Sequence, residues 1–321
     1  MSDVLLDVRE LETRFFLRKG VLTAVDRISF QLHENETLGI VGESGCGKSV
    51  TAMSLLRLVP DPGKITGGQV IYGGEDLLRK SEPEMQALRG RKISMIFQEP
   101  LVALNPAYTV GEQIAECFMI HEGLGKNESY GRAEAALGQV GIMDASRRLY
   151  SYPHEFSGGM RQRVMIAMAL ACDPDILIAD EPTTALDVTI QAQILALLRD
   201  LIRDSTKALI FITHDLGVAA VLCDRIAVMY AGAIVEIADR DALFERPLHP
   251  YTQGLLRSLP YGGKPEKYLD PIPGSLCNLM DPPTGCRFHP RCEQVLDVCA
   301  RECPTLHQVA DHGKTACHLY T

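Results

Sequence analysis

The sequence predicts an α/β protein whose core is a mainly parallel sheet with helices on both faces. Two observations lead to this fold class. Short apolar runs at residues 38–41, 93–97, 175–179 and 208–213 are typical of buried parallel strands, and stretches with helical spacing separate them. The first of these runs leads directly into a glycine-rich loop that is followed by another helical pattern.

The elements around this core follow from local patterns. Residues 5–32 alternate apolar and polar positions, which indicates a half-exposed antiparallel sheet. Residues 65–72 predict a further strand, and residues 110–143 predict a helical insertion. Residues 188–203 predict a helix, and residues 226–237 predict a hairpin that closes the domain.

The composition bounds the class of protein. A chain of 321 residues can form one or two domains, and its formal net charge of −9 argues against a nucleic-acid binder. The apolar runs are too short to span a bilayer, and the first residues lack the basic segment of a secretory signal. We therefore expect a cytosolic protein that reaches a membrane only through a partner.

The glycine-rich loop is the strongest functional signal. Residues 42–49 follow the pattern G-x-x-x-x-G-K-S between a strand and a helix, which is the context of a phosphate-binding loop. Backbone N–H groups and the helix N-terminus would hold phosphate oxygens. Lys48 would reach the β- and γ-phosphates, and the Ser49 hydroxyl would bind Mg²⁺. The expected nucleotide-binding residues are Gly42, Glu43, Ser44, Gly45, Cys46, Gly47, Lys48, Ser49 and Val50.

Polar residues also follow the later buried strands, at the sheet edge where α/β proteins bind ligands. Asp180 and Glu181 suit metal-dependent phosphoryl chemistry, because the first can hold Mg²⁺ through water and the second can orient an attacking water. Gln98 and His214 end two further strands. Taken singly, Gln98 is more often an ordinary strand cap, and His214 is more often a structural histidine.

Two more features admit a functional and a structural interpretation. Ser157, Gly158 and Gly159 precede a helical pattern and form either an anion site or a plain N-cap. Phe15 and Phe16 lie ahead of a loop, where an aromatic ring could stack on a nucleotide base. Periodicity alone favours packing of these rings into the core.

In their order along the chain, these motifs resemble the ATP-binding subunit of an ABC transporter. They correspond to the family's P-loop, Q-loop (Gln98), signature (residues 156–160), Walker B pair, D-loop (residues 185–187) and switch histidine. The signature departs from the usual Leu-Ser-Gly-Gly-Gln only at Phe156 and Met160. The resemblance implies a cassette over residues 1–260, with a helical subdomain at about residues 100–170.

The resemblance also implies roles. Two such subunits sandwich two ATP molecules, and Ser157, Gly158 and Gly159 contact the ATP that the partner holds. Glu181 polarises the attacking water, His214 and Gln98 complete the catalytic set, and Phe15 rather than Phe16 stacks on adenine. The Mg²⁺ ligands are then Ser49, Gln98 and Asp180.

Residues 97–100, 104–106, 108–111 and 246–252 are similar to the peptide and nickel importer branch of this family. That branch implies an ATPase at the cytoplasmic face of the inner or plasma membrane that powers uptake of dipeptides or oligopeptides. Its partners are a second, paralogous ATPase, two integral membrane permease subunits and an extracytoplasmic substrate-binding protein. Import of nickel or another small solute, and a soluble ABC ATPase acting on nucleic acid, are the alternatives.

Residues 261–321 form a small cysteine-rich C-terminal extension. Of the ten cysteines, six lie between Cys277 and Cys317, which in a cytosolic chain indicates a metal site. The spacing C-x₅-C-x₆-C leaves structural zinc and an iron–sulfur cluster equally open. The peptide importer resemblance implies a 4Fe–4S cluster on Cys286, Cys292, Cys299 and Cys317, with Cys303 competing for the fourth place.

Overall fold

The computed structural model describes residues 3–184, 186–203, 207–258, 272–310 and 312–321. The chain forms two compact units. One, here called the helical unit, comprises residues 79–210, and the other, the strand-rich unit, comprises residues 3–78 and 211–321. The strand β8 (Ala208–Thr213) passes from the first unit into the second. Each unit is described by itself.

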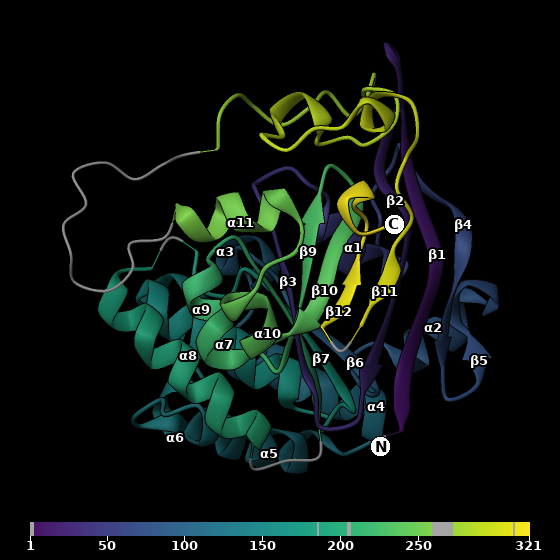
Figure 1. Cartoon of the computed structure of the whole chain (residues 1–321). Helices are drawn as coiled ribbons and strands as arrows, with labels where there is room; N and C mark the ends of the chain where they lie inside the picture. The colour runs from purple at the N-terminus through teal and green to yellow at the C-terminus, as the bar shows by residue number, and fades with distance from the viewer. Residues whose placement is uncertain (1–2, 185, 204–206, 259–271, 311) are drawn as a thin grey trace. The chain divides into compact units, whose positions relative to one another are not determined.

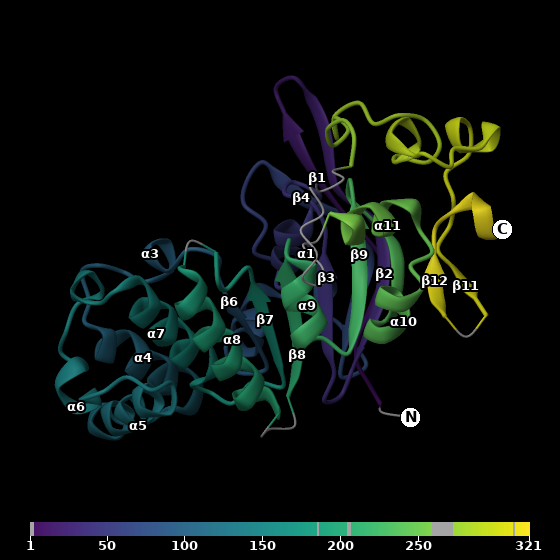
Figure 2. The same ribbon diagram turned by 60° about the vertical axis from the view of Figure 1, so that its left-hand side comes forward.

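The helical unit is built on two fully buried parallel strands. Ile93 of β6 (Ile93–Ile96) lies opposite Ile176 of β7 (Ile176–Asp180), and the start of β8 follows β7 in the sheet. The helices of this unit are α2 (Glu82–Leu88), α3 (Pro100–Ala103), α4 (Val110–Glu122), α5 (Lys126–Gln139), α6 (Ala145–Arg148), α7 (Gly158–Leu170) and α8 (Val188–Arg203). Figure 2 shows α3 to α8 beside β6 and β7.

Local sequence explains where α4 begins and ends. Thr109 and Glu112 form a reciprocal capping box at its N-terminus, which satisfies backbone N–H groups that have no partner inside the helix. Gly123 ends the helix with a φ of 69°, a left-handed conformation that glycine adopts at low cost. The helical insertion expected over residues 110–143 is therefore present, divided between α4 and α5.

The strand-rich unit contains an antiparallel sheet in the order β2-β1-β4-β5. Alternating burial along β1 confirms the predicted half-exposed sheet: Leu6, Val8 and Leu11 are buried while residues between them contact solvent. The strands are β1 (Val4–Leu17), β2 (Gly20–His33), β4 (Gly63–Tyr72) and β5 (Glu75–Asp76).

The second sheet of this unit has the order β11-β12-β10-β9-β3, with the end of β8 following β3. β3 runs parallel to β9, whereas β9 and β10 form the predicted antiparallel hairpin. The strands are β3 (Thr37–Val41), β9 (Arg225–Tyr230), β10 (Ala233–Asp239), β11 (His307–Val309) and β12 (Gly313–Thr315). The helices of the unit are α1 (Lys48–Leu55), α9 (Leu216–Leu222), α10 (Arg240–Glu245) and α11 (Pro250–Arg257).

The C-terminal extension adds strands to this sheet, which the sequence did not predict. β12 pairs antiparallel with β10, and Figure 1 shows β12 and β11, in yellow, beside β10. The carboxylate of Glu236 in β10 is fully buried and accepts the backbone N–H groups of Leu248 and His249. His312 of the extension lies 3.2 Å from the same carboxylate. Buried polar contacts therefore join the extension to β10.

The predicted fold class is confirmed, with parallel core strands, an antiparallel sheet and helices. One strand is shorter than expected, because β6 ends at Ile96 and Phe97 is 40% exposed. Residues 259–271, which contain the predicted boundary between cassette and extension, lie outside the described residues. Within the described chain, no helix has the length and apolar character needed to cross a membrane.

Candidate nucleotide-binding and hydrolysis site

The loop between β3 and α1 has a shape that depends on glycine. Gly42 has a φ of 157°, and a Cβ at this position would lie 2.1 Å from the backbone oxygen of Met229. Gly47 has a φ of 110°, and its Cβ would lie 2.2 Å from the backbone oxygen of Ala24. Both approaches are far closer than atoms tolerate, so any other residue would displace the loop.

The lysine of this loop is held inside it. The Lys48 ammonium donates to the backbone oxygens of Gly42 at 2.9 Å and Glu43 at 3.2 Å, and the side chain is buried. Ser49 and Val50 follow in the first turn of α1 and are half-buried, whereas Ser44 and Gly45 are exposed. The loop thus presents an exposed backbone beside a fixed positive charge, an arrangement suited to phosphate.

Two members of the loop have contacts that the sequence did not indicate. Cys46 is buried, its backbone oxygen accepts the N–H of Gly232, and burial raises the pKa of its thiol. The Glu43 backbone N–H donates to the Tyr251 hydroxyl at 2.9 Å, and its carboxylate pairs with Arg291 of the C-terminal extension. No local pattern could reveal these partners, which lie about 200 residues away or more in sequence.

The expected catalytic carboxylate lies in the helical unit with defined partners. Asp180 is the buried last residue of β7, and Glu181 follows it with a φ of 45°, a costly conformation for a residue with a side chain. Glu181 Oε2 accepts the Thr184 hydroxyl at 2.8 Å and Gln98 Nε2 at 3.4 Å. The structure therefore brings Gln98 and Glu181 together. It also shows that Glu181 contacts Thr184, a residue that the sequence motifs did not indicate.

The residues expected to contact a partner's nucleotide lie at the start of α7. Ser157 is the N-cap of this helix, because its hydroxyl accepts the Met160 N–H at 3.4 Å. A Cβ at Gly159 would lie 2.7 Å from Cγ2 of Ile190 in α8, so packing alone already requires glycine there. Of the expected D-loop, Ala185 lies outside the described residues, while the Asp187 carboxylate accepts the Ile190 N–H at 2.9 Å.

The remaining candidates lie in the strand-rich unit with the phosphate loop. His214 follows β8 and is exposed. Phe15 is half-buried, and its ring lies so close to Gly63 that a Cβ there would be 2.7 Å away. Phe16 is 47% exposed. The candidates thus divide between the units, with Gln98, Ser157, Gly158, Gly159, Asp180 and Glu181 in the helical unit.

Four cysteines of the C-terminal extension influence one another. Burial, and to a smaller extent the neighbouring thiols of Cys299, Cys317 and Cys292, raise the pKa of the Cys286 thiol to about 11. The pKa of Cys317 is raised by burial and then by Cys292 and Cys299. Cys303 is exposed, and it interacts electrostatically with Arg27. Among the described residues, no group of three or more His, Cys, Asp or Glu side chains is arranged to hold a metal ion.

The phosphate loop, together with Asp180 at the end of β7 and Glu181 directly after it, defines a P-loop nucleotide-binding protein. Family comparison agrees: residues 25–184 match the model described as ABC transporter, and residues 235–299 match the C-terminal region of oligopeptide/dipeptide transporters.

Individual relatives and structures support the same assignment. The chain is 50% identical to the dipeptide transport ATP-binding protein DppD of Bacillus subtilis, over 98% of this chain and 94% of that protein. It is 47% identical to the oligopeptide transport ATP-binding protein OppD of Salmonella typhimurium, over 98% of this chain and 94% of that protein. The dimeric, post-hydrolysis ATP-binding cassette MJ0796, bound to ADP and Pi, matches with a TM-score of 0.66 and 27% identity, over 73% of this chain and 98% of that one.

The chain therefore belongs to the ABC transporter family, among the ATP-binding proteins that carry the oligopeptide/dipeptide transporter C-terminal region. This confirms the resemblance seen in the sequence and identifies the chain as an ABC-type ATPase.

Proposed function

We propose that this ATPase powers the import of dipeptides or oligopeptides. The observation that carries the proposal is the Glu181 carboxylate, which follows a buried strand and is oriented by Thr184 and Gln98 in an ABC cassette. A carboxylate held this way can accept a hydrogen bond from water and direct the oxygen toward a phosphorus atom. The peptide substrate is supported by the DppD and OppD relatives and by the matching C-terminal region.

The residues present suit ATP with Mg²⁺. Ser49, Gln98 and Asp180 offer the hydroxyl, amide and carboxylate oxygens that Mg²⁺ prefers. The bound ion would neutralise phosphate charge during hydrolysis. Lys48 supplies a second, fixed positive charge, and His214 is proposed to contact the γ-phosphate. Phe15 is proposed to stack on adenine.

The assembly is part of the proposal. Residues 1–260 are proposed to act as the cassette and residues 261–321 as an extension. Ser157, Gly158 and Gly159 would contact ATP held by a second, paralogous ATPase, because the N-terminus of α7 offers backbone N–H groups to an anion. Two membrane permease subunits and an extracytoplasmic substrate-binding protein complete the importer. The chain would then lie peripherally on the cytoplasmic membrane face.

Reconstituted transport tests this function. The complex of this chain with its permease, ATPase and binding-protein partners, placed in liposomes, should accumulate labelled dipeptide or oligopeptide only when ATP is enclosed. Nickel ion and a free amino acid serve as control substrates. Uptake of nickel in place of peptide would overturn the peptide assignment and favour the metal importer alternative.

We also propose a 4Fe–4S cluster on Cys286, Cys292, Cys299 and Cys317. Its support is the mutual electrostatic effect of these four thiols on one another's pKa, in which Cys303 takes no part. A bound cluster would cross-link the extension and lower the proton affinity of its thiols.

Metal analysis of the anaerobically purified chain tests this site. The wild-type protein should hold iron and acid-labile sulfide at about four atoms each per chain. Cys286→Ser should lose most of the iron, whereas the matched Cys303→Ser variant should keep it. Stoichiometric zinc without iron, or iron loss only in Cys303→Ser, would contradict the assignment.

A further inference from the structure

One ion pair joins the C-terminal extension to the phosphate loop within the strand-rich unit. Arg291 Nη1 lies 2.7 Å from Glu43 Oε2, and Nη2 lies 3.0 Å from Oε1. The guanidinium therefore holds both carboxylate oxygens, the geometry in which arginine binds a carboxylate most strongly. Glu43 directly follows Gly42, so this contact reaches the loop that binds phosphate.

The arginine is itself fixed in place. Its Nε donates to the backbone oxygen of Pro273 at 2.8 Å, and its side chain is only 7% exposed. The guanidinium lies 5.7 Å from the ring centre of Tyr230 and 6.0 Å from that of Phe288. These backbone and ring contacts hold the guanidinium toward Glu43 before any nucleotide binds.

The backbone of Glu43 is anchored as firmly as its side chain. Its N–H donates to the Tyr251 hydroxyl, and its backbone oxygen accepts from the Lys48 ammonium. Tyr251 is fully buried, with its ring centre 4.7 Å from that of Tyr230 and 5.4 Å from that of Phe288. The same ring cluster thus supports both Arg291 and the hydroxyl that holds the loop.

Charge makes this arrangement matter for the nucleotide. Glu43 places a negative charge in a loop whose ligand is a polyanion, and an unpaired carboxylate there would repel the phosphates. Arg291 neutralises that charge and keeps the carboxylate on the side of the extension. We propose that Arg291 is a positioning residue for ATP binding, acting through Glu43. This inference rests on the assigned ATPase activity and names a residue outside its motifs.

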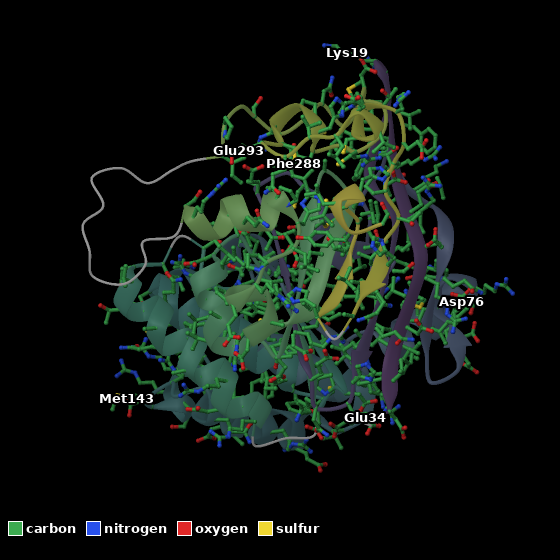
Figure 3. All side chains as sticks on the ribbon, in the orientation of Figure 1. Lys19, Glu34, Asp76, Met143, Phe288 and Glu293 are labelled. Atoms are coloured by element: carbon green, nitrogen blue, oxygen red, sulfur yellow. The ribbon has the colours of Figure 1, made fainter. Side chains whose placement is uncertain are left out.

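Arg291 is the last residue of the 3₁₀ turn η3 (His289–Arg291) and directly precedes Cys292. Its neighbours Phe288 and Glu293 are labelled in Figure 3. The conformational stability of this turn and the affinity of the loop for ATP are then coupled. By thermodynamic reciprocity, bound ATP should stabilise the folded conformation of the turn.

Arg291→Ala in the assembled importer tests the proposal. We expect the KM for ATP to rise about tenfold while kcat at saturating ATP changes less than twofold, because the loop still closes once ATP is bound. Arg291→Lys should recover part of the loss, since it restores the charge without the bidentate contact. The Kd for ATP of the isolated full-length chain should follow the KM.

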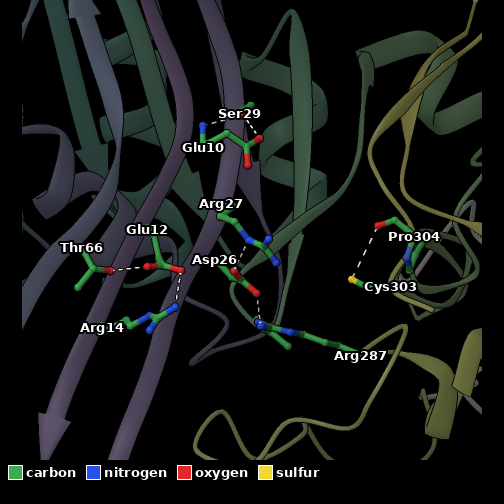
Figure 4. Close-up of polar contacts among 11 residues, drawn as sticks. Glu10, Glu12, Arg14, Asp26, Arg27, Ser29, Thr66, Arg287, Cys303 and Pro304 are labelled. Atoms are coloured by element: carbon green, nitrogen blue, oxygen red, sulfur yellow. Dashed lines mark hydrogen bonds and ion pairs between the residues drawn. The ribbon is translucent and has the colours of Figure 1, made fainter. Parts of the chain in front are cut away.

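Two comparisons separate this role from a general loss of structure. In a Glu43→Gln background, Arg291→Ala should have less than a third of its effect on KM, because the carboxylate that it neutralises is gone. Arg287 is the matched control: it belongs to the same extension but binds Asp26 of β2 and the backbone oxygen of Ala231 (Figure 4). Arg287→Ala should leave the KM unchanged.

An unchanged KM in Arg291→Ala, an equal rise in the Glu43→Gln background or an equal rise in Arg287→Ala would each overturn the proposal. A wrong assignment of the ATPase activity would give a different result. The wild-type complex would then hydrolyse no ATP, whatever residue stands at position 291.

Discussion

Glu181→Gln is expected to lower ATP hydrolysis by the assembled complex about 100-fold or more while ATP remains bound, which matches the size of a general-base contribution. The amide has the same length as the carboxylate and still accepts the Thr184 hydroxyl, so the loop keeps its contact. It also meets the same backbone cost at a φ of 45°. What it loses is the negative charge that polarises water.

Steady-state phosphate release and retained nucleotide after gel filtration measure the two effects. Glu134→Gln, an exposed carboxylate on α5, is the matched control and should hydrolyse ATP at the wild-type rate. Thr184→Ala should give an intermediate loss of about tenfold, because the carboxylate is present but less well oriented. Near-wild-type hydrolysis by Glu181→Gln would remove Glu181 from the mechanism.

Lys48→Ala is expected to weaken ATP binding about 100-fold, equal to about 2.7 kcal/mol. Two losses combine in this change. The ammonium no longer faces the phosphates, and the backbone oxygens of Gly42 and Glu43 lose the donor that spans the loop. Catalysis falls as a consequence, because the site is mostly empty at ordinary ATP concentrations.

Equilibrium binding of a fluorescent ATP analogue to the full-length chain provides the measurement. Lys64→Ala serves as control, since this lysine lies on β4 of the same unit and is exposed. An ATP affinity within threefold of wild type for Lys48→Ala would contradict the assigned role of the loop.

Much of the fold could be predicted because its signals are local. The helix α8 and the strand β8 have the predicted bounds, since each is a continuous periodic or apolar segment. The hairpin of β9 and β10 was predicted from two apolar runs around Ala231-Gly232. The phosphate loop was predicted because glycine, lysine and serine at fixed spacing have one well-known use.

The rest depends on contacts between distant residues. β12 has three residues and therefore no measurable periodicity, and its partner β10 lies more than 70 residues earlier. Arg291 and Glu43 are 248 residues apart, so neither position gives a sign of the other. The contact of Thr184 with the Glu181 carboxylate occurs beside an unusual φ at Glu181, which no sequence pattern indicates.

The pairing of β12 with β10 bears on how the chain can be divided. The matched C-terminal family region begins at residue 235, inside β10, and not at the predicted boundary near residue 260. Removing the extension would uncover the backbone edge of β10 and take His312 from the buried Glu236 carboxylate. An exposed edge of this kind promotes self-association, so the cassette and its extension should be expressed and engineered as a single polypeptide.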